Sequence, residues 1–365
     1  MKTKLFAFAL ILALMLSMVA CGNNAESSTS SITETTSNET EVPSIEEPIP
    51  DESMMAEPEP KADSDVETSA IEEPKAETPT PEPFIPEESP TIEELQAEVP
   101  QLFTQHDYQD AETGLSLSYN LYLPEGYSED ERYPLVMFIP DSTCVGQSTE
   151  AVLQHYGCLI WASEAVQKDH PCIVLAPMYP QIIIDDHSSY TTTEYISLTR
   201  NLILSLEGTY AVDTNRIYGT GQSMGAMTIM YLEAQYPELF AACLIVDGQW
   251  NVTELMGLKN SKMFYFAAEG DDRAYAGMQE LQPALEEAGA VITNGKWNAT
   301  WDVETMHTAL DEVLSAETDL NFIVWELGSV MPEGMESPFG EHMFSFVHPY
   351  KVHGVREWLL SQVAE

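Results

Sequence analysis

The chain has few basic residues for its length. Lys and Arg together number 14 against 60 Asp and Glu, which gives a formal net charge of −46 over 365 residues. Nucleic acid binds to protein largely through Lys and Arg, so this balance excludes nucleic acid as a partner. Anionic membrane surfaces repel such a chain for the same reason, so attachment to a membrane needs another cause.

Cysteine is scarce as well, with five in the whole chain. Their spacing fits no Cys/His metal motif. Setting aside Cys21 leaves four: Cys144, Cys158, Cys172 and Cys243. These four can pair in three ways, and the sequence does not choose among the pairings. Cys243 lies in an apolar run expected to be a buried strand, which favours a free thiol at that position.

The first twenty residues supply another means of membrane attachment. Lys2 and Lys4 precede the apolar run Leu5–Met18, which is too short to span a bilayer comfortably and is typical of an export signal. The small residues before Cys21 resemble a bacterial lipobox, in which the cysteine is diacylated; the alternative is an ordinary signal peptide with an incidental cysteine. We expect a signal peptide over residues 1–20 and a lipid anchor on Cys21, with the protein facing outside the cytoplasm.

Aromatic residues are nearly absent from the next segment, which is rich in Ser and Thr and then in Glu and Pro. Such a segment has too little apolar surface to offset the entropy of ordering it. We therefore expect an extended, disordered stalk over residues 21–98. The remaining residues, 99–365, suit one folded domain that is large enough to bury a core without disulfides or metal.

Beyond residue 98 the pattern predicts strands that alternate with helices. Leu115–Leu123 alternates apolar and polar residues, as a half-buried strand does. Leu135–Ile139 is a continuous apolar run, typical of a buried parallel strand. Further strands are expected over residues 172–176, 216–219, 240–246, 263–268 and 322–325, and helices over 193–207, 225–236, 279–288, 305–314 and 352–363. This alternation predicts an α/β fold with a doubly wound, mainly parallel sheet.

The motif Gly-Gln-Ser-Met-Gly at residues 221–225 lies between an expected strand and an expected helix. A serine on a sharp strand-to-helix turn presents its hydroxyl above the sheet, as in the α/β-hydrolase fold. The flanking Gly221 and Gly225 keep Cβ atoms out of that turn. Ser223 is therefore the candidate nucleophile.

A serine nucleophile needs a base, and in this fold the chain order is serine, acid, histidine. Three histidines follow in the right region. His342 enters the last helical region from a loop, which allows its imidazole to reach across the end of the sheet. We prefer it to His348, which precedes a proline, and to His353, which lies within the last helix. His307, on an earlier expected helix, is interpreted as solvated.

The base in turn needs a carboxylate to orient it. Asp271 lies in the loop after the expected strand 263–268, where α/β folds place site residues. Asp272 beside it and Asp247, at the end of an earlier strand, remain alternatives.

The oxyanion hole needs two backbone N–H groups. One is expected from Met224, the residue after the nucleophile. The second should come from the loop after Leu135–Ile139, where Pro140 has no N–H to offer. Ser142 is the first candidate and Asp141 the second.

The stretch Val212–Gly225 resembles the elbow region of secreted esterases related to polyhydroxybutyrate depolymerases and feruloyl esterases. Further matching stretches are Tyr236–Ala242, Ala268–Asp271, His342–Phe346, Tyr350 and Arg356–Gln362. The resemblance covers residues 115–362 and implies an α/β-hydrolase in which Ser223, Asp271 and His342 form the triad. One departure is that such enzymes usually have His-Gly or His-Asp where Pro140-Asp141 stands.

We therefore expect a serine carboxylic ester hydrolase that needs no cofactor or metal. The resemblance favours esters of carbohydrates or aromatic acids, either as small molecules or linked to a polysaccharide. Trp250 is a candidate wall of the substrate pocket, with ordinary loop packing as the alternative. Two other functions remain open: a serine peptidase of the prolyl-oligopeptidase type, and a non-catalytic solute-binding lipoprotein.

Overall fold

The structure is a computed structural model that describes residues 88–187 and 189–364. These residues fall within one compact unit, Phe84–Glu365. The expected signal peptide, Cys21 and the stalk up to residue 87 lie outside the described residues.

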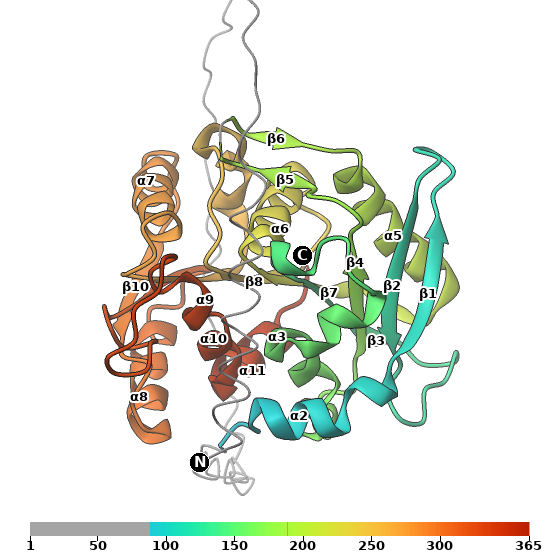
Figure 1. The fold of residues 1–365 in the computed structure, drawn as a ribbon, viewed down its shortest axis with the longest axis horizontal. Coiled ribbons are helices and arrows are strands. Elements are labelled where there is room, and N and C mark those ends of the chain that lie inside the picture. Colours follow the sequence, from blue (N-terminus) through green and yellow to red (C-terminus); the bar gives the residue numbers. More distant parts are fainter. Residues whose placement is uncertain (1–87, 188, 365) are drawn as a thin grey trace, which may run out of the picture. The chain divides into compact units, whose positions relative to one another are not determined.

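A nine-stranded sheet runs through the domain in the order β1-β2-β4-β3-β7-β8-β9-β11-β10. β1 is antiparallel to β2 and β2 to β4, and every other neighbouring pair is parallel (Figure 1). The strands are β1 (Thr104–Gln109), β2 (Ser116–Tyr122), β3 (Tyr133–Ile139), β4 (Ile173–Met178), β7 (Val212–Gln222), β8 (Ala242–Val246), β9 (Met263–Ala268), β10 (Ile292–Trp297) and β11 (Leu320–Trp325). The predicted doubly wound, mainly parallel sheet is confirmed.

Helices cover both faces of this sheet, as Figure 1 shows. One face carries α5 (Tyr195–Thr209), α6 (Met224–Gln235) and α7 (Ala274–Glu287). The other face carries α2 (Ile92–Glu98), α3 (Tyr156–Leu159), α8 (Val303–Leu314), α10 (Val347–Lys351) and α11 (His353–Ser361). Because successive side chains of a strand point to opposite faces, β9 contributes Tyr265 to the first core and Phe266 to the second. A strand buried on both faces must be apolar throughout, which explains its run of six buried residues.

Two strands of the sheet were not predicted, β1 and β10. They are the edge strands, and most of their residues are exposed or half-buried. An edge strand needs no continuous apolar run, so the pattern that revealed the central strands is missing from both. A short hairpin of β5 (Ile184–Asp185) and β6 (Thr191–Thr192) was not predicted either.

The boundary expected at residue 98 is corrected by α2. Thr91 caps this helix, accepting the Glu94 N–H, while the Glu94 side chain accepts the Thr91 N–H in return. Leu95 on the same helix is buried in the second core. Farther upstream, Ser89 accepts a hydrogen bond from buried Arg356 at 3.0 Å. The folded domain therefore begins about ten residues earlier than expected, because one short helix of seven residues is enough to join the core.

The four cysteines of the domain are free and buried, which leaves no disulfide among them. Burial raises the pKa of each thiol, that of Cys172 to about 12. Thiols that stay protonated in this way are chemically unreactive. Within the described part of the chain, no helix combines the length and the apolar character needed to cross a lipid bilayer.

Candidate active site

Ser223 stands on a sharp turn between β7 and α6. Its backbone lies at φ +53° and ψ −118°, a conformation that non-glycine residues rarely adopt and that costs on the order of 1–3 kcal/mol. The N–H of Ser223 donates to the carbonyl oxygen of Val246 at 3.0 Å, which ties the turn to the end of β8. Strain held in this way at one serine is the expected mark of a nucleophile elbow.

The glycines of the motif are required by close backbone approach. A Cβ atom on Gly225 would lie 2.0 Å from the carbonyl oxygen of Ile139, at the end of β3. A Cβ atom on Gly221 would lie 2.6 Å from the carbonyl carbon of Gly225. Helix α6 can therefore leave the sheet at this steep angle only because both positions lack a side chain.

Gly225→Ala is expected to destabilise the domain by at least about 2 kcal/mol, because the clash is with backbone atoms that cannot rotate away. Gly208→Ala is the matched control: Gly208 lies near the end of α5, and an added Cβ there would meet nothing within 4 Å. The control should be neutral or more stable, by up to about 1 kcal/mol. Urea denaturation followed by circular dichroism measures both. Equal stability of the two variants would contradict the proposed packing of the elbow.

The predicted base and acid meet the nucleophile. His342 begins the short helix α9 (His342–Ser345). Its Nε2 lies 2.8 Å from Ser223 Oγ, and its Nδ1 lies 2.5 Å from Asp271 Oδ2. The structure thus brings two distant residues into contact with the imidazole of His342. Ser223 lies 119 positions from it in the chain, and Asp271 lies 71 positions from it.

Asp271 is fixed by the start of α7. Its Oδ1 accepts the backbone N–H groups of Arg273 and Ala274, each at 3.1 Å. Only Oδ2 is left for the imidazole, so the helix start sets the direction from which His342 is held.

A second carboxylate joins the acid loop to the histidine loop. Glu341 is buried, and its Oε2 accepts the Gly270 N–H at 2.8 Å. Its own N–H donates to the Gly270 carbonyl at 3.1 Å, and Oε1 accepts the N–H of Gly328. The residues just before Asp271 and His342 are therefore bonded to each other. Sequence reasoning missed this role of Glu341, since nothing local marks a glutamate as a loop clamp.

The alternative acids and bases lie elsewhere. Asp272 is exposed, and the Asp247 side chain bonds to Ser345 and to the Ala268 N–H. The ring of His348 lies tilted against that of Trp325, and its Nε2 is 3.4 Å from the carbonyl oxygen of Val330.

The other two histidines considered in the sequence analysis each lie near a carboxylate on their own helix. His353 lies 3.8 Å from Glu357 on α11, and His307 lies 3.5 Å from Asp311 on α8.

The electrostatics of the three side chains favour a charged acid and a basic imidazole. Burial opposes the imidazolium of His342, but the hydrogen bond and the charge of Asp271 are the main effects that outweigh it, and the pKa of His342 is raised. Burial also opposes the Asp271 carboxylate, but His342 and the two backbone N–H groups outweigh it and lower the pKa of Asp271. By contrast, burial lowers the pKa of His348 to about 4. Asp271 is therefore ionised near neutral pH and supports an imidazole that gains a proton readily.

Met224 and Ser142, the predicted oxyanion donors, each begin a helix. Met224 is the first residue of α6 and Ser142 the first of the 3₁₀ turn η3 (Ser142–Cys144). The first N–H groups of a helix have no acceptor within it, which leaves them available to a ligand. The close approach of Gly225 to Ile139 and Pro140 brings the start of α6 against the loop that leads to Ser142.

A buried polar network holds the loop that carries Ser142. Gln222 Nε2 donates to Asp141 Oδ2 at 2.7 Å, and it also lies 3.1 Å from His155 Nδ1. His155 Nε2 lies 3.1 Å from Cys144 Sγ. The loop that departs from the esterase pattern at Pro140 is thus braced from another segment. Sequence reasoning missed His155, because it lies 67 positions from Gln222 and no motif links the two.

Trp250 does not form an exposed pocket wall. Its side chain is 3 % exposed, its Nε1 donates to Glu254 at 2.5 Å, and its ring packs edge-on against Tyr231 and Tyr190. These contacts favour the alternative interpretation, in which Trp250 packs within its loop. Of the three aromatic rings, that of Tyr190 is the exposed one.

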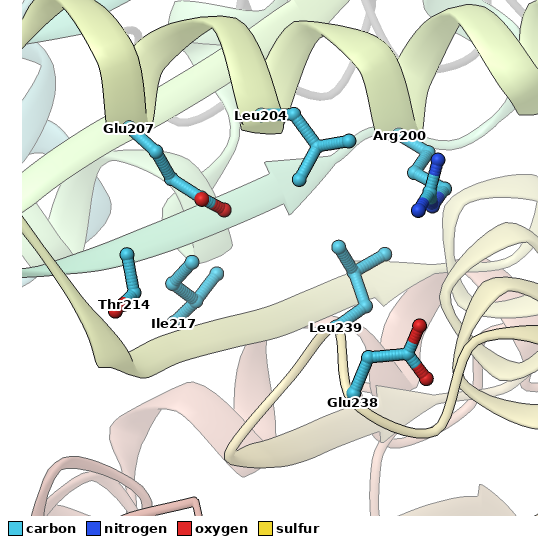
Figure 2. A pocket seen from close by; sticks show the side chains of 7 residues that line it. All are labelled: Arg200, Leu204, Glu207, Thr214, Ile217, Glu238 and Leu239. Atoms are coloured by element: carbon cyan, nitrogen blue, oxygen red, sulfur yellow. The ribbon is translucent and has the colours of Figure 1, made fainter.

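A pocket of about 200 Å³ lies away from the triad, between α5 and β7 (Figure 2). In Figure 2 the side chains of Arg200 and Leu204 hang from α5 over Leu239, with Glu207 and Glu238 nearby. None of the lining residues belongs to the candidate site, and nothing in the pocket indicates a ligand.

Three possible metal ligands gather beside the β5–β6 hairpin. Donor atoms of Asp185, Asp186 and His187 lie within 4.8 Å of one another. Two of these groups already have partners, because Arg273 contacts Asp186 at 2.5 Å and His187 Nδ1 lies 2.6 Å from Asp185. The cluster therefore ties the hairpin to the start of α7.

Comparison with known proteins shows similarity at the level of structure. No protein-family model matches the sequence, and no curated protein is significantly similar to it. A thermostable esterase structure aligns with a TM-score of 0.59 at 24% identity, over 73% of this chain and 64% of that one. The chain thus spans about two thirds of that esterase's length.

Two further structures align with lower scores. A feruloyl esterase module from Clostridium thermocellum, complexed with sinapinate, has a TM-score of 0.49 at 15% identity, over 74% of this chain and 95% of that one. A ferulic acid esterase from Anaeromyces mucronatus has a TM-score of 0.42 at 13% identity, over 70% of this chain and 91% of that one. The sheet order, the elbow and the alignment with the thermostable esterase together show that this chain has the α/β-hydrolase fold.

Proposed function

We propose that the protein is a serine hydrolase of carboxylic esters that uses Ser223, His342 and Asp271 as its triad. The observation that carries this proposal is the continuous chain of contacts Oγ–Nε2 at 2.8 Å and Nδ1–Oδ2 at 2.5 Å. Such a chain, on a strained serine at the carboxyl end of a parallel sheet, is the arrangement that activates a hydroxyl for attack on a carbonyl.

The reaction follows from these contacts. As Ser223 Oγ attacks the ester carbonyl carbon, His342 Nε2 takes its proton and Asp271 stabilises the resulting imidazolium. The N–H groups of Met224 and Ser142 receive the oxyanion. Collapse of the tetrahedral intermediate breaks the bond to the alcohol oxygen, which leaves with the proton from His342. Water, deprotonated by His342, then cleaves the acyl-enzyme to the free acid and restores the serine.

Esters of carbohydrates or of aromatic acids are the proposed substrates. The resemblance of residues 115–362 to feruloyl esterases supports this class, and the structural similarity to a thermostable esterase supports an ester substrate. The net charge of −46 supports neutral rather than anionic substrates, since a negatively charged ester is repelled by the chain as a whole.

A panel of esters tests the proposal. Purified protein should hydrolyse simple acetyl esters, acetylated sugars and methyl ferulate, and should leave a prolyl peptide amide intact. Cleavage of the peptide amide without any ester turnover would replace the esterase proposal by the peptidase alternative. No turnover of any member, together with tight binding of a solute, would support a binding lipoprotein.

The proposed location is the outer side of the cell membrane, with Cys21 as the lipid-bearing residue. The support is the export signal and the small residues before Cys21. Bacterial cells expressing the full chain should incorporate labelled palmitate into it, and Cys21→Ala should abolish the incorporation and release the protein from the membrane fraction. Labelling that persists in Cys21→Ala would contradict the assignment.

A further inference from the structure

Asp247 is a buried carboxyl group beside the triad that the proposed reaction does not use. It follows directly after β8, its side chain is fully buried, and its backbone has φ +46°. Aspartate is one of the few residues that tolerate such a backbone, but at a cost. The burial and the backbone strain of Asp247 therefore need a physical explanation.

The three loops that carry the triad converge on this place. The N–H of Ser223 bonds to the carbonyl of Val246, the residue before Asp247. Asp247 Oδ1 accepts the N–H of Ala268, three positions before Asp271, at 2.8 Å. Asp247 Oδ2 contacts the hydroxyl of Ser345, at the end of α9. Nucleophile, acid and base loops are therefore all bonded to one two-residue segment.

Ser345 extends this contact to the base itself. Its Oγ lies 2.8 Å from the carbonyl oxygen of His342 and also within hydrogen-bond distance of Asp247 Oδ2. A hydroxyl has one hydrogen, so it can donate to only one of these two oxygens. Both bonds form only when Asp247 carries a proton on Oδ2, donates to Ser345, and leaves the Ser345 hydrogen for the His342 carbonyl.

We propose that protonated Asp247 and Ser345 form a latch, Asp247 to Ser345 to the His342 carbonyl, that positions His342 against Ser223. The inference rests on the proposed function of the triad. Asp247 is a positioning residue in it, since its side chain touches neither substrate nor the reacting atoms. Asp271 keeps the role of the charged acid.

The charges around Asp247 agree with a neutral carboxyl group. Burial and the nearby Asp271 carboxylate raise the pKa of Asp247 to about 7, against the opposing effects of His342, Ser345 and the Ala268 N–H. The titratable groups that face Asp247 are Asp271, His342, Tyr265 and Tyr350. Two adjacent carboxylates cannot both ionise cheaply in a buried site, and Asp271 holds its charge through His342.

Asp247→Asn is the decisive variant, because an asparagine amide donates to Ser345 and accepts from Ala268 as the neutral acid does. Asparagine also tolerates the positive φ. We expect this variant to keep kcat within about threefold of the unmodified protein near pH 7, because its amide makes the same two bonds as the protonated acid. The amide cannot ionise, so the latch stays closed above the pKa of about 7 at which Asp247 loses its proton. At alkaline pH the variant should therefore be at least as active as the unmodified protein.

Ser345→Ala breaks the latch without touching the strained backbone. Loss of the bond to the His342 carbonyl frees the imidazole to leave the line to Ser223, which should lower kcat between about 10- and 100-fold while KM changes little. If Asp247→Asn loses activity on the order of 10⁴-fold, as a triad does when its charged acid becomes an amide, Asp247 acts as a charged acid and the latch is wrong. If Ser345→Ala keeps full kcat, the latch has no positioning role.

A measurement that needs no turnover separates this inference from the proposed function. The imidazole of His342, assigned by its loss in His342→Ala, is titrated by NMR in the unmodified protein and in Asp247→Asn. Because a protonated Asp247 carries no charge for the variant to remove, we expect the pKa of His342 to be the same in both proteins, even if no ester is ever hydrolysed. A lower pKa in Asp247→Asn would show that Asp247 is charged while His342 titrates, and it would overturn the latch. Absence of ester turnover with an unchanged titration would overturn only the esterase proposal.

Discussion

Replacing Ser223 by alanine is expected to reduce ester turnover by a factor on the order of a million, the size of effect seen when a serine nucleophile is removed from a triad. The loss is this large because the rest of the triad has no function without a hydroxyl to attack the carbonyl. The fold should survive, since the change removes one oxygen atom at a half-buried turn and no core packing. Steady-state hydrolysis of an activated acetyl ester measures the effect.

The control for this variant is Ser361→Ala at the end of α11. The exposed Ser361 hydroxyl bonds to the carbonyl of Trp358 and to the Gln362 side chain, away from the triad, so its removal should leave turnover unchanged. Circular dichroism of both variants should match that of the unmodified protein. A Ser223→Ala protein that retains more than a few per cent of its activity would rule out the serine mechanism.

Replacing His342 by alanine is expected to have an effect of similar size, because Ser223 then has no group to take its proton. His348→Ala and His353→Ala are matched controls, since all three histidines lie within twelve positions of one another. His348 lies against Trp325, and His353 lies near Glu357 on α11. Both controls should keep most of the turnover, with at most a loss of stability.

The pH profile adds a second check on the base. Only the neutral imidazole accepts the serine proton, so activity rises as His342 loses its proton. The raised pKa of His342 places the midpoint of that rise above the ordinary imidazole value of about 6.5. If His348→Ala were the inactive variant, or if the midpoint lay near the pKa of about 4 that burial gives His348, His342 would not be the base.

Much of this arrangement could be predicted from the sequence because its signals are local. The motif at residues 221–225 marks the elbow, since only glycine tolerates the backbone contacts at Gly225. The buried strand Met263–Ala268 has the same bounds in the structure as in the prediction, and it points to Asp271. For the choice of His342 among three histidines, the sequence offered its place in a loop and the resemblance of residues 342–346 to secreted esterases.

The features that escaped prediction depend on contacts between distant segments. Asp247 was considered as a triad acid, and only the path through Ser345 shows its different position. Gln222 is one of the unspecified positions of the motif, yet it holds Asp141 across 81 positions. Helix α2 is different, because its capping pair Thr91 and Glu94 is a local sequence signal. It marks the start of a helix within the segment expected to be disordered.

The most direct test of the account is covalent labelling of the nucleophile. Intact protein is incubated with a fluorophosphonate probe, and the modified site is located by mass spectrometry of the digested chain. The account predicts one added phosphonyl group, on Ser223, with no labelling of Ser223→Ala and strongly slowed labelling of His342→Ala. Labelling on another residue, or equal labelling of the Ser223→Ala protein, would contradict it.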